Sequence, residues 1–135
     1  MISALDTSVI LDVLRRDARF GPSSLETVRR ASLEGNLIVA PAVWAEVCAA
    51  FDDADEAKST LDKIGVELVG DDRAIATAAG SAWRAYRRAG GTRRRVLADF
   101  LIGAHAMLKA DRLLTRDRGF YQSYFRELRI LDPSA

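Results

Sequence analysis

The chain has 135 residues and a net charge of +1, with 49% hydrophobic and 29% charged residues, which is typical of one globular domain spanning residues 1–135. Its one cysteine and one histidine exclude an internal disulfide and supply too few ligands for a structural zinc site, so side-chain oxygens are the only plentiful metal ligands. No run of about 18 apolar residues exists, and Asp6 interrupts the N-terminal apolar run too early for a signal peptide. We therefore expect a cytoplasmic protein with no membrane segment.

The first 14 residues predict a strand followed directly by a helix. Residues 2–5 form a short apolar run, as in a buried strand. Asp6, Thr7 and Ser8 then precede apolar residues at helical spacing, as helix N-cap residues do. Asp6 would thus lie at the carboxyl end of a strand, where sites form in open α/β sheets. Taken alone, it is more simply explained as the N-cap.

The remaining chain alternates between short apolar runs and segments with helical periodicity. Four further strands are predicted at residues 36–40, 66–69, 112–115 and 128–131. Helices are predicted from a cap at Ser23 or Ser24 to Gly35, at residues 42–51 and 53–65, from a cap at Asp71 or Asp72 to Ala89, and at residues 96–109. Such alternation indicates an α/β protein with a parallel sheet covered by helices on both faces.

The helix predicted at residues 42–51 contains one acid, Glu46. Trp44, Val47 and Cys48 recur at the spacing of a core-facing stripe. Glu46 lies about 200° around the helix from Trp44, at 100° per residue. By itself it is best interpreted as a solvent-facing residue.

The charges are segregated along the chain. Eight acids and two lysines lie between residues 52 and 72, whereas residues 84–95 contain six arginines and no acid. An arginine cluster on a nearly neutral chain suggests contact with a polyanion on one face. A solvated helix end and loop is the alternative.

Asp117 repeats the placement of Asp6, because it follows a short apolar strand and lies beside the hydroxyl of Thr115. If the two strands are neighbours at a switch point of the sheet, their carboxylates converge in one crevice. Asp99, in the first turn of a helix, can reach the same crevice, and Glu46 could do so. Gathered carboxylates repel one another unless protonated or neutralised by cations. Oxygen-only ligands suit Mg²⁺ or Mn²⁺, which activate water in phosphoryl transfer.

No other catalytic set competes with these acids. The chain has no Walker-type phosphate loop and no nucleophile elbow. A phosphatase with an aspartyl nucleophile would have a second Asp at position 8, where this chain has Ser8.

Three segments carry a family resemblance. Residues 5–8 (Leu-Asp-Thr-Ser), residues 98–106 around Asp99 and residues 113–120 around Asp117 resemble the first, third and fourth acidic motifs of PIN-domain nucleases. The last segment, with the Leu-Asp-Pro at residues 131–133, is similar to VapC-type toxins in particular. Glu46 falls where the family carries its second acid, which reverses the interpretation given above. The resemblance covers nearly the whole chain.

The resemblance implies a three-layer α/β/α sandwich around a mainly parallel sheet, with the first strand at the centre. It implies Mg²⁺- or Mn²⁺-dependent endonucleolytic cleavage of RNA. It also implies a homodimer that a cognate VapB-type antitoxin holds inactive by placing its tail in the site.

The resemblance also assigns roles to individual residues. The catalytic and metal-site acids would be Asp6, Glu46, Asp99 and Asp117, of which Asp6 and Asp99 are the firmest direct ligands. Ser8 and Thr115 would support the carboxylates by hydrogen bonds. The residues expected to hold the RNA backbone are Arg93, Arg94, Arg95, Arg116 and Arg118.

Two other functions remain open. The first is a non-catalytic PIN-like module that binds RNA or a partner protein, although the presence of all four acids argues against a degenerate site. The second is a metal-dependent DNA nuclease, since the same acids could cut either polymer.

Overall fold

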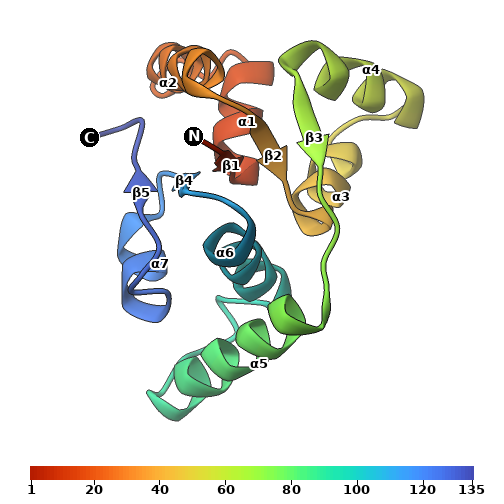
Figure 1. Ribbon diagram of the computed structural model, residues 1–135. Coiled ribbons are helices and arrows are strands. Elements are labelled where there is room, and N and C mark those ends of the chain that lie inside the picture. Colours follow the sequence, from red (N-terminus) through yellow and green to blue (C-terminus); the bar gives the residue numbers. More distant parts are fainter.

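The protein forms five strands and seven helices in a computed structural model that describes all 135 residues (Figure 1). In chain order the elements are β1 (Ser3–Leu5), α1 (Thr7–Leu14), α2 (Gly21–Glu34), β2 (Leu37–Val39), α3 (Pro41–Ala49), α4 (Ala54–Ile64), β3 (Val66–Leu68), α5 (Arg73–Arg88), α6 (Leu97–Lys109), β4 (Arg112–Leu114), α7 (Arg118–Tyr124) and β5 (Ile130–Leu131). None of the helices combines the length and apolar character needed to cross a lipid bilayer.

The five strands form one sheet in the order β3-β2-β1-β4-β5, and every neighbouring pair is parallel. The expected parallel sheet with the first strand at its centre is therefore confirmed. The chain adds β2 and β3 on one side of β1 and then crosses to add β4 and β5 on the other. The switch point thus lies between β1 and β4, where the backbone N–H of Asp6 donates to the carbonyl of Leu114 (3.0 Å).

Helices cover both faces of the sheet and make three layers, as predicted (Figure 1). One layer contains α1, α2 and α4, and the opposite layer contains α5, α6 and α7. The helix α3, at the end of β2, contacts α1 in one layer and α6 in the other. Every residue of β1 and β2 is buried, and all of them except Ser3 are apolar, as expected for strands that helices cover on both faces.

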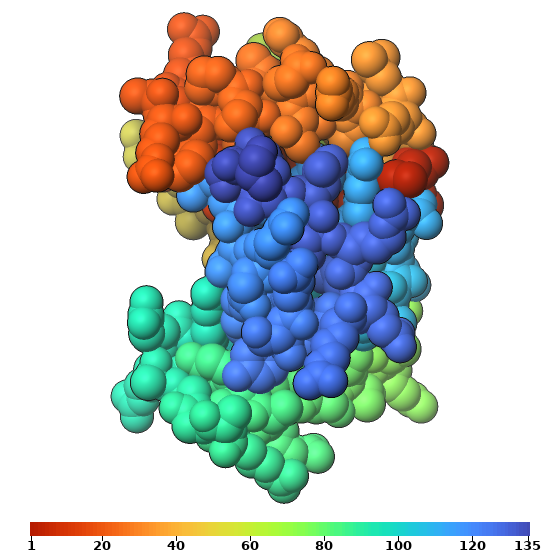
Figure 2. Space-filling model, turned by 90° about the vertical axis from the view of Figure 1, so that its left-hand side faces the viewer, coloured from red at the N-terminus to blue at the C-terminus, as the bar shows by residue number.

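An aromatic cluster joins the three helices of the second layer. The ring of Phe100 lies 5.5 Å from Tyr86 and 5.3 Å from Phe120, and Tyr86 also lies 5.5 Å from Tyr124, measured between centroids. The segment at residues 118–124, to which the sequence analysis assigned no element, is a helix held by these contacts. In Figure 2 this segment (blue) lies between the orange region that contains α2 and the green region that contains α5. The cluster therefore fixes the position of Asp117, directly before α7.

The start of α2 differs from the prediction. The helix begins at Gly21 with Pro22 in its first turn, and neither predicted serine caps it. The carboxylate of Asp17 instead accepts the backbone N–H of Phe20 (2.7 Å), which orders the turn before the helix. Ser24 is buried and donates its hydroxyl to Asp12 (3.0 Å), a long-range contact that spacing could not reveal.

The core-facing side of α3 also differs from the prediction. Its buried residues are Val43 and Val47, whereas Trp44 and Cys48 are only partly buried. The buried face is centred on the two valines, so the helix is rotated relative to the expectation. This rotation brings Glu46 toward the carboxyl ends of the strands.

Gly103 of α6 should be intolerant of a side chain because Phe125 packs directly against it. A Cβ at position 103 would lie 2.4 Å from the Cε2 atom of this buried ring. We expect Gly103→Ala to lower the free energy of unfolding by about 1–3 kcal/mol through overpacking. The control is Gly80→Ala on the exposed side of α5, where no atom lies within 4 Å and helix propensity predicts a gain of up to about 1 kcal/mol. Urea denaturation would contradict this if both variants shifted stability equally.

Candidate active site

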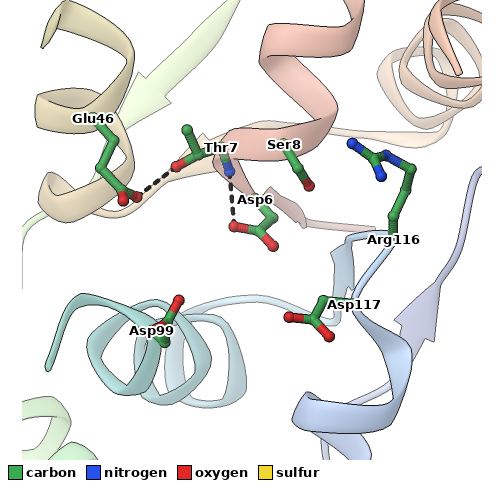
Figure 3. Close-up of a pocket in the computed structure, with 7 residues that line it drawn as sticks. All are labelled: Asp6, Thr7, Ser8, Glu46, Asp99, Arg116 and Asp117. Carbon is green, nitrogen blue, oxygen red and sulfur yellow. Dashed lines mark hydrogen bonds between the residues drawn. The ribbon is translucent and has the colours of Figure 1, made fainter. Parts of the chain in front are cut away.

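A polar hollow of about 460 Å³ opens at the carboxyl ends of β1 and β4 (Figure 3). None of its lining residues is hydrophobic, and the four acids predicted from sequence all contribute to it. Asp6 comes from the end of β1, Glu46 from α3, Asp99 from the first turn of α6 and Asp117 from the residue before α7. The full lining is Asp6, Thr7, Ser8, Glu46, Asp99, Arg116 and Asp117.

Asp6 is held by hydrogen bonds at both carboxylate oxygens. Its Oδ1 accepts the backbone N–H of Thr7 (2.8 Å), so the residue is the N-cap of α1. Its Oδ2 accepts the hydroxyl of Thr115 (2.7 Å) from the end of β4. The side chain is therefore both a helix cap and a wall of the hollow, and the two interpretations of the sequence are not alternatives.

The pKa of Asp6 rises from 3.8 to about 6. Burial is the largest cause, since the residue is only 9% exposed and loses hydration of its charged form. Hydrogen bonds from Thr115 and Thr7 lower the pKa, whereas the charges of Glu46 and Asp99 raise it. The site therefore disfavours a negative charge that an added cation would stabilise.

Two hydroxyl groups hold the acids, but they are those of Thr115 and Thr7 and not those of Thr115 and Ser8, as predicted. Thr115 donates to Asp6 and accepts the backbone N–H of Asp117 (3.0 Å), which confirms its expected contact with the carboxylates. The expected hydrogen bond from Ser8 is wrong: its Oγ is buried and has no partner. The neighbouring hydroxyl of Thr7 holds a carboxylate instead, because it donates to Glu46 (2.7 Å). Both hydroxyls directly follow Asp6, and no sequence signal separates them.

Asp99 and Asp117 extend the site into the second helical layer. Asp99 accepts the backbone N–H of Val96 (3.0 Å), which fixes its carboxylate at the start of α6. Asp117 forms an ion pair with Arg95, whose Cζ lies 4.2 Å from the ring centroid of Phe120. One of the arginines predicted to bind RNA is thus already in contact with a site acid.

Arg116 lines the hollow but is bound within the protein. Its guanidinium contacts both carboxylate oxygens of Asp12 (2.7 and 3.1 Å) and lies 4.1 Å from the ring centroid of Phe20. Asp12 is itself buried and also accepts the hydroxyl of Ser24. The geometry favours a positioning role for Arg116, which ties the end of β4 to α1. Sequence analysis did not single out Asp12.

The other arginines expected to bind RNA are exposed. Arg93, Arg94 and Arg118 make no ion pair. Arg93 and Arg94 lie in the loop between α5 and α6, beside Arg95, whereas Arg118 begins α7. These three side chains are therefore available to an external anion.

Tyr121 is a further residue near the acids, and no pattern in the sequence singled it out. Burial raises the pKa of its phenol well above 10, and the charges of Asp6, Asp99 and Asp117 raise it further. The phenol is therefore neutral at physiological pH. It supplies an uncharged wall behind three carboxylates.

The donor set suits a hard divalent cation. The four carboxylates and the unpartnered Oγ of Ser8 are oxygen ligands in one hollow, which is what Mg²⁺ and Mn²⁺ prefer. As placed, no three acidic side chains are close enough together to hold an ion. Thr7 holds Glu46 and Arg95 holds Asp117, so both would have to turn away from these partners to reach a shared cation.

Fold and site together define an α/β/α protein with an acidic cleft at the switch point of its sheet. The sequence matches the PIN domain family over residues 4–125, and the chain therefore belongs to this family. A comparison with curated protein sequences found no significant match.

Solved structures of VapBC and FitAcB share the fold at low sequence identity. VapBC2 from Rickettsia felis, bound to a DNA fragment from its promoter, contains a chain that is 17% identical, with a TM-score of 0.77 and 98% of each chain covered. VapBC-1 from nontypeable Haemophilus influenzae gives 18% identity, a TM-score of 0.77 and complete coverage of both chains. FitAcB from Neisseria gonorrhoeae gives 20% identity, a TM-score of 0.71 and 98% coverage of each chain.

The raised pKa of Asp6 predicts that its charge destabilises the metal-free protein at neutral pH. Between about pH 4 and pH 6 the folded protein retains a proton that the unfolded chain releases, so stability falls as pH rises through this range. At pH 7.5 we expect the free energy of unfolding of Asp6→Asn to be roughly 1–2 kcal/mol higher than that of the wild type. The substitution removes the cost of burying the charge, but it also disturbs the hydrogen bond to Thr115.

Most of that gain should disappear near pH 4, where Asp6 is protonated in the folded protein and partly protonated in the unfolded chain. Denaturation in chelator at the two pH values measures it, and the control is Asp62→Asn on the exposed face of α4. An equal gain at both pH values would contradict the assignment.

Proposed function

We propose that the protein is a divalent-metal-dependent endoribonuclease and the toxin of a VapBC-type toxin–antitoxin pair. The observation that carries the proposal is the convergence of four carboxylates, from four separate elements, in one polar hollow of a PIN-family chain. No apolar residue lines this hollow, so it suits a charged polymer with cations rather than an apolar ligand.

Asp6 and Asp99 are the proposed direct ligands of Mg²⁺ or Mn²⁺. Backbone N–H groups at the starts of α1 and α6 hold their side chains in place. Glu46 and Asp117 would complete the site, directly or through water, after leaving Thr7 and Arg95. Such an ion, when bound, polarises water and stabilises charge on a phosphate.

The side chains of the chain contribute positioning and proton transfer. Thr115 bridges Asp6 and Asp117 and so keeps the two strand ends in register. Glu46 is the most exposed of the acids and can face the hollow once it leaves the hydroxyl of Thr7. We assign its Oε atoms as the acceptor for a proton from the attacking water in an in-line displacement.

Binding of the RNA backbone is assigned to arginines near the edge of the hollow. Arg93, Arg94 and Arg118 are exposed, and Arg95 joins them when Asp117 turns to a cation. Such contacts supply affinity and salt dependence with little sequence preference. Arg116, also expected to bind RNA, is assigned instead to positioning, because Asp12 already takes its guanidinium.

The partners are assigned from the structural relatives. The matching chains belong to VapBC and FitAB complexes, and this chain covers them almost completely. We therefore propose a VapB-type antitoxin as the inhibitor and a homodimer as the functional form. Size-exclusion chromatography with light scattering of the purified chain tests the dimer.

Metal-dependent cleavage of RNA is the direct test of the function. Purified protein, stripped of any bound partner, is incubated with total cellular RNA and separately with DNA, in Mg²⁺, Mn²⁺ or chelator. We expect discrete RNA fragments that require metal and that fall at least 100-fold in Asp99→Asn, which loses a ligand. The control is Glu127→Gln, an exposed acid outside the hollow. RNA binding without cleavage would indicate a binding module, and cleavage of DNA alone would indicate a DNA nuclease.

Arg95 should compete with the metal for Asp117. We expect Arg95→Gln to bind Mn²⁺ several-fold more tightly, because the variant removes a guanidinium that holds this carboxylate. RNA binding should weaken several-fold because a phosphate contact is lost. The control is Arg94→Gln, which should weaken RNA binding and leave the metal affinity unchanged. Calorimetric titration in which Arg95→Gln binds Mn²⁺ less tightly would contradict the competition.

A further inference from the structure

A second hollow is linked to the acidic one by Arg95, which lines the second hollow and forms an ion pair with Asp117 of the first. It is formed by the end of α5, the loop that follows and the start of α6, and its volume is about 560 Å³, within the range of small-molecule sites. The end of α5 and this loop project at the lower left of Figure 2. Three arginines line it (Arg87, Arg93 and Arg95) and no acid does. Its charge is therefore opposite to that of the acidic hollow.

The wall of this hollow contains a rigidly held aromatic ring. The indole of Trp83 stacks on the buried ring of Phe100, with centroids 6.2 Å apart and planes inclined by 25°. The guanidinium of Arg87 lies over the same indole, with its Cζ 4.9 Å from the ring centroid. Val96 and Leu97 add apolar surface, although they are 55% and 44% exposed. The hollow thus combines a flat aromatic ring, apolar side chains and a guanidinium group.

The loop that closes the hollow is fixed in shape. Gly90 has a φ of +85°, which favours glycine. The N–H of Gly91 donates to the carbonyl of Tyr86 (2.9 Å), and a Cβ at position 91 would lie 2.4 Å from the Tyr86 ring. Tyr86 belongs to the aromatic cluster that also holds α7. The hollow and the acidic site are therefore built on one rigid support.

These surfaces match the two parts of a nucleotide. Single-stranded bases stack on aromatic rings and on arginine guanidinium planes, whereas the phosphates bind arginine. The three arginines without an acid disfavour a cationic ligand and complement a polyanion. Because Arg95 lines this hollow and pairs with Asp117 of the acidic one, a strand held here would lie next to the carboxylates.

We propose that this groove is a subsite for one nucleotide of single-stranded RNA next to the bond that is cut. Its base packs against Trp83, Arg87 and the apolar side chains of Val96 and Leu97. Its phosphate binds Arg93 and, once released from Asp117, Arg95. This assignment rests on the proposed ribonuclease function and extends it by naming a site for a flanking base.

The test uses fluorescence anisotropy with a labelled 12-nucleotide single-stranded RNA, in chelator to prevent cleavage. A matched series carries one abasic ribose at successive positions. We expect Trp83→Leu to weaken binding of the intact RNA roughly 5- to 20-fold, and Trp83→Phe to keep most of the affinity. One abasic position should weaken binding to the wild type by a similar factor and cause no further loss in Trp83→Leu.

Two further variants separate the subsite from a loss of folding, which thermal melting monitors. Leu97→Asp places an acid in the groove at the first turn of α6, where an acidic residue is compatible with the helix, and should weaken RNA binding at least 5-fold. Trp44→Leu, on α3, is the matched control and should leave RNA affinity unchanged. Unchanged affinity in both Trp83→Leu and Leu97→Asp would overturn the subsite, as would equal binding of the intact and all abasic RNAs.

Cleavage kinetics distinguish this proposal from the proposed function. If Trp83→Leu cleaves with a raised KM and an unchanged kcat, the subsite is supported. If Trp83→Leu cleaves with unchanged KM, the ribonuclease stands and the subsite fails. If the abasic dependence is found but the wild type cleaves no RNA with metal, the groove binds a base as proposed, whereas the nuclease assignment and the placement next to a cut bond fail. If the groove variants keep RNA affinity but lose a bound protein partner, the groove is a protein interface.

Discussion

The buried carboxylate of Asp6 is the group on which the rest of the arrangement depends. It lies at the carboxyl end of the central strand, where the sheet reverses its order and the two neighbouring loops separate. Hydrogen bonds from Thr7 and Thr115 hold it there, but they do not offset the loss of hydration, and its pKa remains near 6. A metal-free protein thus stores unfavourable electrostatic energy at this point, which a bound cation relieves.

The acids belong to opposite layers of the molecule, which gives the cation a structural role as well. Asp6 and Glu46 approach from above in Figure 3, whereas Asp99 and Asp117 approach from below. The strands β1 and β4 and the bridge through Thr115 keep the layers in register. The aromatic cluster around Phe100 then sets the positions of both Asp99 and Asp117. The protein core brings the elements that carry these acids close together, and an ion bound among the carboxylates would connect them directly.

Much of this arrangement follows from local sequence pattern. The short apolar runs predict the five strands, and the acids that follow two of them predict the crevice, because parallel strands end at the same edge of a sheet. Side-chain pairing across long sequence separations does not follow from such patterns. Arg116 pairs with Asp12 across 104 positions and Thr7 reaches Glu46 across 39. Local patterns therefore revealed neither the ion pair of Arg116 nor that Thr7, and not Ser8, contacts a carboxylate. The rotation of α3 is set by packing of Val43 and Val47, which hydrophobic periodicity alone did not separate from Trp44 and Cys48.

The most direct test of the account is a crystal structure of the protein grown with Mn²⁺, with the ion located by its anomalous scattering. We expect a peak between Asp6 and Asp99, with Glu46 and Asp117 turned toward it and Arg95 released from Asp117. The absence of any peak among these carboxylates at a Mn²⁺ concentration that supports RNA cleavage would contradict it. So would an ion bound elsewhere while the pair of Arg95 and Asp117 stayed intact.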